Sequence, residues 1–305
     1  MLVTILVVGS FLIVIAARYL VKPLKLMTNA ATRMAGGDFS VRLPVRRGDE
    51  LGELADTMNR MALSLSQLET MRQDFVSSVS HEIQSPLTSI GGFAEALRDK
   101  EVTEEERERY ISIIKQESNR LSRLSENLLN LASLDSQQHP YHPETYRLDR
   151  QLRDIVLACE PHWMGKKQMV ELLMEETVIS ADKDQLSQVW MNLLANSIKF
   201  TPEEGVISFS LTERDGIAVV TISDTGIGIR EEDRARLFER FYKGDASRER
   251  SRGGSGLGLS IAKRIVVIHN GTIELDPNSD QSAGASFVVR LPLQPAVLPA
   301  GLSSS

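Results

Sequence analysis

A histidine followed directly by a carboxylate, His81 and Glu82, lies in the stretch SSVSHEIQSPLTSIGGF, residues 77–93. A neutral imidazole is a nitrogen nucleophile, and a neighbouring carboxylate can orient it and accept its proton. Val79 and Ile83 each lie two positions away, so His81 faces roughly opposite the apolar stripe of the helix that they predict. From its position alone, His81 is equally compatible with an ordinary surface histidine. We apply that surface interpretation to the other four histidines, His139, His142, His162 and His269.

Proline stands at position 86, five residues after the histidine and inside the same predicted helix. A proline costs roughly 3 kcal/mol in a helix interior, so something should offset it. Because the ring removes one backbone hydrogen bond, it permits a bend one turn beyond His81. We therefore expect Pro86 to mark a hinge below the nucleophile.

Two glycine-rich stretches have the composition of phosphate-binding loops. DTGIGI, residues 224–229, follows a predicted strand, and GGSGLGLS, residues 253–260, opens a predicted helix. Glycine lets backbone amides approach phosphate oxygens, and a helix amino terminus adds partial positive charge. Each stretch alone is weak, because turns are rich in glycine. A third stretch, NLLANSIKFTP, residues 192–202, places amide side chains and a lysine on another predicted helix.

The composition excludes several classes of protein. The chain has 305 residues and a formal net charge of −6 without a dense basic block, which argues against a nucleic-acid partner. Its length suits about two domains with connecting elements. Its one cysteine, Cys159, excludes an internal disulfide framework and a cysteine-based zinc cluster, and fits a reducing compartment.

The chain begins with MLVTILVVGSFLIVIAA, a run without charge. We predict a single transmembrane helix over residues 1–20; the alternative is a cleaved secretory signal, although there the charges usually precede the apolar run. The flanking positive residues are Arg18, Lys22, Lys25 and Arg33. They place the rest of the chain in the cytoplasm and leave no extracytoplasmic domain. Because the chain begins at its only span, it fits a naturally short protein, a fragment, or a subunit that relies on a membrane partner.

Residues 21–70 predict a helix from Pro23 to Gly36, an extended connector through Pro44 and a second helix that opens near Asp49. The second helix has apolar residues in alternating steps of three and four: Leu51, Leu54, Met58, Met61, Leu65 and Leu68. This spacing predicts a coiled-coil seam, and an ordinary core-facing helix is the alternative. The spacing loses phase over residues 71–75, where a coiled coil would rewind locally.

Residues 71–140 predict a hairpin of two long helices. Its apolar positions are Val76, Val79, Ile83, Leu87, Ile90, Ala94 and Leu97, then Tyr110, Ile114, Leu121, Leu124, Leu128 and Leu131. One hairpin buries only one stripe of each helix, so we expect two copies to pair into a four-helix bundle and predict an obligate homodimer.

Helix and strand patterns alternate from residue 146 to residue 293, which predicts an α+β two-layer domain with helices on one sheet face. The expected helices are 148–159, 183–200 and 257–269, and the expected strands are 169–174, 206–213, 218–224, 272–276 and 286–292. Residues 294–305 read as a disordered tail.

SHEIQSPL resembles the H box of sensor histidine kinases. The resemblance implies that His81 accepts phosphate from ATP at Nε2, that Glu82 is the general base through Nδ1, and that Ser85 has a possible phosphatase role. The family often has threonine or asparagine where this chain has Ser85. Residues 21–70 resemble the HAMP signalling module, including Pro23 and the motif at Asp49, Glu50 and Gly52.

The three loop and helix stretches, with LFERFYKGD, resemble the N, G1, F and G2 boxes of the GHKL ATP-binding fold in the right order. The resemblance implies that Asn196 binds Mg²⁺ with support from Asn192, that Lys199 faces the phosphates, and that Phe200 lies by the adenine. It implies that Asp224 binds the exocyclic amine of adenine and that Gly226 and Gly228 shape the pocket wall. A lid would run from Phe238 and Phe241 to Gly254, Gly256 and Gly258, with Lys243 and Arg248 as γ-phosphate contacts; a solvated loop is the alternative.

Asn192 separates reaction classes, because GHKL enzymes that hydrolyse ATP usually carry a water-activating glutamate four residues before the magnesium asparagine. The resemblance, from Pro23 to Pro292, implies a bacterial, membrane-anchored sensor histidine kinase with a cytoplasmic kinase region. It would use ATP and Mg²⁺ to phosphorylate His81 and would pass the phosphate to an aspartate of a separate response regulator. The alternatives are a membrane scaffold that binds ATP without catalysis, and a GHKL ATPase or chaperone.

Overall fold

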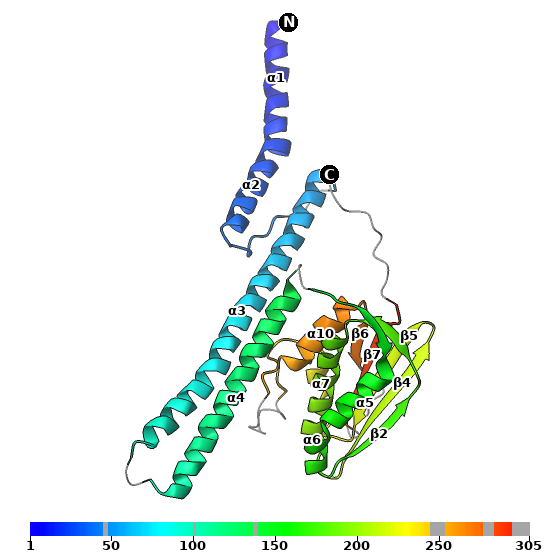
Figure 1. Ribbon diagram of the computed structural model, residues 1–305. Coiled ribbons are helices and arrows are strands. Elements are labelled where there is room, and N and C mark those ends of the chain that lie inside the picture. The colour runs from blue at the N-terminus through cyan, green and yellow to red at the C-terminus, as the bar shows by residue number, and fades with distance from the viewer. Residues whose placement is uncertain (45–47, 100–101, 137–139, 245–253, 277–283, 295–305) are drawn as a thin grey trace. The chain divides into compact units, whose positions relative to one another are not determined.

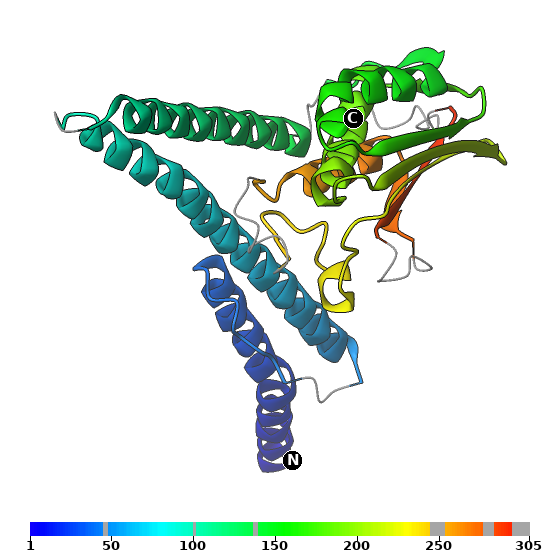
Figure 2. The same ribbon diagram turned by 90° about the horizontal axis from the view of Figure 1, so that it is seen from below.

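The computed structural model describes residues 1–44, 48–99, 102–136, 140–244, 254–276 and 284–294. By its internal contacts the chain divides into two compact units, residues 1–81 and residues 82–305. One long helix, α3 (Glu50–Ala96), contains the boundary between them. Figures 1 and 2 show the helices and strands of each unit.

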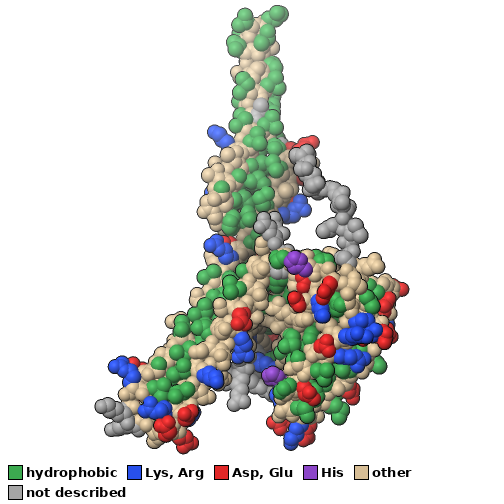
Figure 3. Space-filling model, viewed as in Figure 1, with side chains coloured by type: hydrophobic (Ala, Val, Ile, Leu, Met, Phe, Trp, Pro, Cys, Tyr) green, Lys and Arg blue, Asp and Glu red, His purple; other side chains and the backbone are tan. Residues whose placement is uncertain are grey.

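The first unit begins with apolar helical chain. Helix α1 (Leu2–Ala16) continues through a π-helical turn, Ala17–Val21, into α2 (Lys22–Ala35). The uninterrupted 34-residue stretch is the one helix among the described residues that is long and apolar enough to cross a membrane. Hydrophobic side chains cover the visible face of α1 (Figure 3), as expected for a helix that is apolar all round. Pro23 stands in the first turn of α2, directly after the π-helical turn, a kind of irregularity that is found where the regular helical hydrogen bonds are interrupted.

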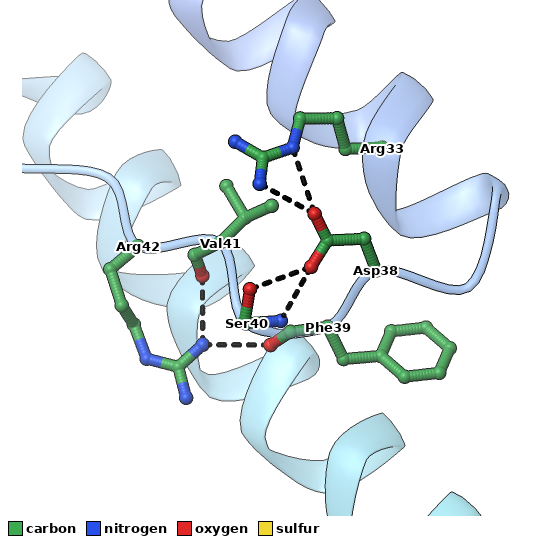
Figure 4. A network of polar contacts seen from close by, with 6 residues as sticks. All are labelled: Arg33, Asp38, Phe39, Ser40, Val41 and Arg42. Atoms are coloured by element: carbon green, nitrogen blue, oxygen red, sulfur yellow. Dashed lines mark hydrogen bonds and ion pairs between the residues drawn. The ribbon is translucent and has the colours of Figure 1, made fainter.

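A polar network holds the connector that follows α2 (Figure 4). The Asp38 carboxylate accepts a 2.6 Å hydrogen bond from the Ser40 hydroxyl and also pairs with the Arg33 guanidinium. These hydrogen bonds, the one from Ser40 first, lower the pKa of Asp38 to about 2. Further on, the Asn59 side chain bonds both the N–H and the C=O of Leu43, at 2.8 and 2.9 Å. The predicted helix (α2), the extended connector through Pro44 and the second helix, which begins at Glu50, are all present.

Helix α3 has 47 residues and runs without interruption through both the predicted phase slip and Pro86. The slip over residues 71–75 thus leaves the backbone helical, and the proline is accommodated inside one continuous helix. Within the first unit, the small residues Ala55 and Ala62 are buried. Part of the predicted seam points to solvent in the single chain, with exposures of 45%, 53% and 58% at Leu54, Met61 and Leu68. Their spacing of seven is that of a face left for a partner helix.

The second unit contains the predicted helical hairpin, whose second helix is α4 (Glu104–Asp135). A capping box starts α4: Thr103 accepts from the N–H of Glu106, whose carboxylate accepts from the N–H of Thr103. Near the turn the rings of Phe93 and Tyr110 lie 5.2 Å apart. The buried residues of α4 are Leu124, Leu131 and Leu134.

A five-stranded mixed sheet forms the centre of the remaining chain, with strand order β2-β4-β5-β7-β6. The strands are β2 (Met169–Met174), β4 (Val206–Arg214), β5 (Ile217–Asp224), β6 (Thr272–Leu275) and β7 (Ser286–Pro292). Strands β2 and β4 are parallel, and the other pairs are antiparallel. Burial alternates along β4 and β5, so one sheet face carries the core.

Helices α5, α7 and α10 cover that face of the sheet (Figures 1 and 2). Their bounds are Leu148–Ala158, Lys183–Phe200 and Gly258–Ile268. The core between the layers includes Trp190, Phe209 and Ile222, all almost fully buried. The α+β two-layer prediction is confirmed, and each predicted helix and strand of this domain is present to within two residues at each end.

Among the described residues of this domain, four short elements are absent from the sequence prediction. They are β1 (Glu144–Arg147), α6 (Glu160–Gly165), β3 (Val178–Ala181) and α8 (Glu231–Arg234). Strands β1 and β3 pair antiparallel as a separate two-stranded sheet. Four to six residues are too few to show a hydrophobic period, so these elements depend on tertiary contacts.

Candidate functional site

Helix α7 carries the amide and lysine side chains predicted to face a nucleotide. Asp182 caps its amino terminus, accepting a 3.1 Å hydrogen bond from the N–H of Gln185. Asn192, Asn196 and Lys199 follow at steps of four and three, so they share one side of the helix. All three are half-buried, while the opposite side of α7 packs into the core. The helix therefore presents these three side chains together.

Asp224 ends β5 and is the most constrained carboxylate of the site. Its Oδ1 accepts from the N–H groups of Gly226 and Ala285, at 2.9 and 3.2 Å, and its Oδ2 accepts from the Ser197 hydroxyl at 3.1 Å. Burial raises the pKa of this carboxyl above its ordinary value, although the three hydrogen bonds oppose that shift. The side chain is thus held in one orientation at the end of a central strand.

Backbone packed around Asp224 leaves no room for side chains at two glycines. A Cβ at Gly226 would lie 2.6 Å from Asp224 Oδ1 and 2.9 Å from the carbonyl oxygen of Phe200. A Cβ at Gly284 would lie 1.6 Å from the carbonyl oxygen of Asp224, and Gly284 also has φ +100°. Gly284 is absent from the sequence prediction, because nothing in its local sequence reveals the close approach of β5.

The second glycine stretch lies against α7 and against Phe241, which precedes the stretch in the chain. Gly256 has φ +72°, and a Cβ there would lie 2.7 Å from the carbonyl carbon of Phe241. The Phe241 N–H donates a 3.0 Å hydrogen bond to the Gly256 carbonyl, which joins the two ends of residues 241–256. At the start of α10, a Cβ at Gly258 would lie 3.3 Å from Asn192 Oδ1. The predicted N and G2 stretches are therefore in contact in the folded domain.

Two lysines contribute positive charge to this region. The Lys199 ammonium lies 4.8 Å from the centre of the Phe200 ring. A Cβ at Gly254 would lie 3.3 Å from the same ammonium nitrogen. Burial lowers the pKa of Lys199, and the charge of Lys243 lowers it further. Both lysines and Phe200 are half-buried, and Arg248 lies outside the described residues. A cradle of glycine backbone with two nearby ammonium groups has the chemistry of a polyphosphate site.

The amide side chains fit a hydrated magnesium ion better than a protein metal cage. No group of three histidine, cysteine, aspartate or glutamate residues suited to a metal occurs in the described part of the chain. Magnesium prefers oxygen ligands and commonly keeps waters while it binds substrate phosphates. The buried Asn192 Nδ2 has no hydrogen-bond partner among the described protein groups. The amide oxygens of Asn192 and Asn196 thus fit Mg²⁺ as minor ligands beside phosphate.

The stretch predicted to hold the phosphoacceptor lies in the middle of α3. His81 and Ser85 are exposed, and Pro86 is buried. Glu82 is half-buried, and both of its carboxylate oxygens are engaged: Oε2 lies 3.1 Å from Arg120 of α4, and Oε1 pairs with Lys243. Arg120 is a further contact that the sequence prediction missed, because the two residues are 38 positions apart.

His269 corrects the surface interpretation that we gave to four of the histidines. Its side chain is only 5% exposed, because it lies at the carboxyl end of α10 against the start of α7. Nε2 accepts a 3.1 Å hydrogen bond from the Asp182 N–H, which leaves Nδ1 to donate to the Ile265 carbonyl at 2.8 Å. Burial lowers the pKa of His269 below its ordinary value. His142 and His162 are exposed, and His139 lies outside the described residues.

Three family models match consecutive parts of the chain. The HAMP domain matches residues 15–67, the His Kinase A (phospho-acceptor) domain matches residues 71–137, and the histidine kinase-, DNA gyrase B- and HSP90-like ATPase matches residues 181–295. The exposed His81 lies in the second of these matched segments, and the glycine-lined cradle lies in the third. The chain therefore carries, in this order, segments that match these three domains, and over nearly its whole length it is similar to sensor histidine kinases.

Individual relatives agree with this assignment. The sensor histidine kinase YclK of Bacillus subtilis is 34% identical over 291 residues, which cover 91% of this chain and 60% of YclK. The heme sensor protein HssS of Staphylococcus saprophyticus is 35% identical over 290 residues, which cover 94% of this chain and 61% of HssS. The chain thus spans about three fifths of the length of these curated relatives.

The fold also matches a solved kinase complex. The structure of histidine kinase ThkA with the response regulator protein TrrA superposes with a TM-score of 0.62, covering 75% of this chain and 64% of that chain. At 24% identity this likeness concerns the fold alone.

Proposed function

We propose that this chain is a membrane-anchored protein-histidine kinase that moves the γ-phosphoryl group of ATP to His81. The observation that carries the proposal is the pairing, in one chain, of an exposed histidine beside a carboxylate with a glycine and lysine cradle that lacks a water-activating acid at Asn192. A bound γ-phosphate in such a cradle is kept for a protein nucleophile.

The nucleotide would be held by the residues at the carboxyl end of β5 and on α7. Asp224 would accept a hydrogen bond from the adenine amine, since its hydrogen bonds to Gly226, Ala285 and Ser197 fix its direction. Phe200 would lie by the ring, and Lys199 would neutralise phosphate charge. Gly226, Gly228, Gly254, Gly256 and Gly258 would shape the pocket wall and the base of a lid, with Lys243 and Arg248 toward the γ-phosphate.

Asn196, supported by Asn192, would hold a magnesium ion through its amide oxygen. When bound, that ion neutralises charge on the phosphates. The adenine, by contrast, requires only the carboxylate of Asp224 and the aromatic ring of Phe200.

The transfer is an in-line substitution at phosphorus. The lone pair of His81 Nε2 forms the new P–N bond while the bond from the γ-phosphorus to the bridging oxygen breaks and ADP leaves with that electron pair. The proton on Nδ1 passes to the Glu82 carboxylate, which acts as general base. Ser85, one turn further along α3, keeps a hydroxyl that could orient water for dephosphorylation of the partner.

The phosphoryl group would then pass to an aspartate of a separate response regulator. The ThkA structure contains the response regulator TrrA, and the matching fold supports a comparable partner here. Two copies of the hairpin would pair into a four-helix bundle, since each copy leaves apolar residues of α3 exposed. We divide the chain into a span (1–20), a HAMP module (21–70), the phosphoacceptor hairpin (71–140), the ATP-binding domain (146–293) and a tail (294–305).

Autophosphorylation tests the proposal directly. The full chain in lipid nanodiscs is incubated with Mg²⁺ and γ-labelled ATP, and we expect protein-bound label that is stable to base and labile to acid. His81→Gln should reduce the label to background, whereas His142→Gln, an exposed histidine of the same chain, should leave it unchanged. Label that survives in His81→Gln would overturn the assignment of the acceptor.

The two alternatives give different results in the same assay. A scaffold would bind nucleotide but acquire no label. A GHKL ATPase would release phosphate steadily, at a rate that His81→Gln does not change.

A further inference from the structure

The Glu82 carboxylate, which the proposed function makes the general base, is shared between two cations. Arg120 of α4 lies 3.1 Å from Oε2, and Lys243 pairs with Oε1. The side chain of Glu82 is 20% exposed, that of Arg120 31% and that of Lys243 26%, so water screens these charges only in part. Both carboxylate oxygens of Glu82 are therefore occupied by cations, and neither is free to contact the imidazole of a histidine.

Lys243 reaches Glu82 from the rim of the glycine cradle. The preceding residues are fixed: the Phe241 N–H bonds the Gly256 carbonyl at 3.0 Å, and the Tyr242 hydroxyl bonds Asp233 Oδ1. The backbone that carries Lys243 is therefore anchored to the nucleotide side of the domain, while its ammonium group is directed to α3.

The charges around Lys243 are out of balance. Lys199 is near enough for the charge of Lys243 to lower its pKa, and it has no carboxylate partner in the described part of the chain. Of these two ammonium groups, that of Lys243 pairs with the Glu82 carboxylate, which Arg120 also holds, while that of Lys199 lies over the Phe200 ring. A polyanion placed between the two lysines would relieve their repulsion and would attract Lys243 away from Glu82.

We propose that Glu82 and the terminal phosphate of a bound nucleoside triphosphate compete for Lys243. Without the triphosphate, Lys243 occupies Oε1 of Glu82. When the γ-phosphate takes Lys243, Oε1 becomes free to accept a proton, and Arg120 on Oε2 keeps the carboxylate in place. Arg120 is then a positioning residue, and the base beside His81 becomes available only when a phosphoryl donor is bound. This inference rests on the proposed ATP site.

Nucleotide binding to the full chain in nanodiscs tests the competition without turnover. The probes are Mg²⁺ with AMPPNP, which carries a terminal phosphate, and Mg²⁺ with ADP, which does not. Because binding and ion pairing at Lys243 exclude each other, removing the charge of Glu82 should strengthen triphosphate binding. A partly exposed ion pair is worth up to about 1 kcal/mol, so Glu82→Gln should raise the affinity for AMPPNP about two- to fivefold. The affinity for ADP should stay the same.

Two further variants separate competition from a general loosening of the molecule. Asp135→Asn removes a different carboxylate, on α4, that also pairs with the domain, through Arg240 at 2.7 Å and Arg264 at 3.5 Å. We expect it to leave the ratio of AMPPNP to ADP affinity unchanged. In a Lys243→Ala background, Glu82→Gln should no longer raise AMPPNP affinity, because the shared cation is absent.

Each outcome bears on a stated part of the inference. The competition would be overturned if Glu82→Gln changed the affinity for both nucleotides equally or left both affinities unchanged. It would also be overturned if Asp135→Asn gave the same selective gain in AMPPNP affinity. Both results would leave the proposed kinase intact. If the wild-type chain bound neither nucleotide, the proposed function would fail and the competition with it. Circular dichroism of each variant checks that the helices and the sheet are formed.

Discussion

The ATP-binding domain and the helix α3 differ in where their apolar side chains find partners. In the domain, Trp190, Leu193 and Ile222 are fully buried by other parts of the same chain. Along α3, large apolar residues point to solvent, and Leu87 is 51% exposed beyond the HAMP region as well. An exposed apolar row at heptad spacing indicates a missing partner helix, whereas an isolated exposed residue does not. The domain therefore contains its own core, whereas the exposed apolar residues of α3 support the dimer proposed above.

The largest expected effect tests the self-contained core. Trp190 is fully buried in α7, and its indole N–H donates to Gln151 Oε1 at 3.2 Å. Trp190→Ala should destabilise the domain by about 3–5 kcal/mol, because it leaves a large cavity. Denaturant unfolding followed at two protein concentrations should show the same loss at both. A loss that depended on concentration would mean that the core is completed by the partner copy.

The next effect tests the helical interface. Leu87→Glu puts a charge on an exposed apolar position of α3 within the predicted hairpin, where we expect the partner helix to cover it. The change should weaken dimerisation by about 2 kcal/mol or more, because each dimer would bury two unpaired charges. Mass photometry of the chain in detergent over a dilution series measures the dissociation.

The matched control lies on the sheet domain. Leu173 of the edge strand β2 is 76% exposed, and Leu173→Glu should leave the dimer unchanged. A dimer that tolerated Leu87→Glu but not Leu173→Glu would place the interface on the sheet domain and not on α3.

The smallest effect sharpens the comparison inside the domain, at the end where α7 and α10 meet. The folded-state pKa of His269 is lowered by burial, so the neutral imidazole contributes stability above its unfolded pKa, about 6.5. That contribution is lost as the pH falls through the folded pKa. We expect the midpoint of thermal unfolding to fall more between pH 7.5 and pH 5.5 in the wild type than in His269→Gln.

The variant itself should cost about 1–3 kcal/mol at pH 7.5, since it disturbs the buried bond from the Asp182 N–H. His142→Gln, which changes an exposed histidine, should keep the wild-type pH dependence. An equal pH dependence in His269→Gln and the wild type would show that other groups control acid stability.

Much of the fold follows from local sequence because its elements are long and strongly periodic. The 18 residues of α7 and the alternating strands β4 and β5 show their periods clearly, and Thr103 with Glu106 marks the start of α4. The elements of four to six residues could not be predicted in this way. The sequence predicted helix around residues 71–75 and Pro86, and α3 is continuous through both, because a lost heptad phase changes the packing partner without requiring a break in the helix.

The sequence by itself predicted which residues carry the chemistry: the His81 and Glu82 pair, the two glycine stretches and the asparagines of α7 all stand in short motifs that local spacing reveals. Only the tertiary structure decided what surrounds them. It brought Arg120 and Lys243, 38 and 161 positions away, to the Glu82 carboxylate, placed Gly284 against Asp224, and buried His269 between two helices. The physical reason is that charge, close backbone approach and burial depend on long-range contacts, which no local pattern records.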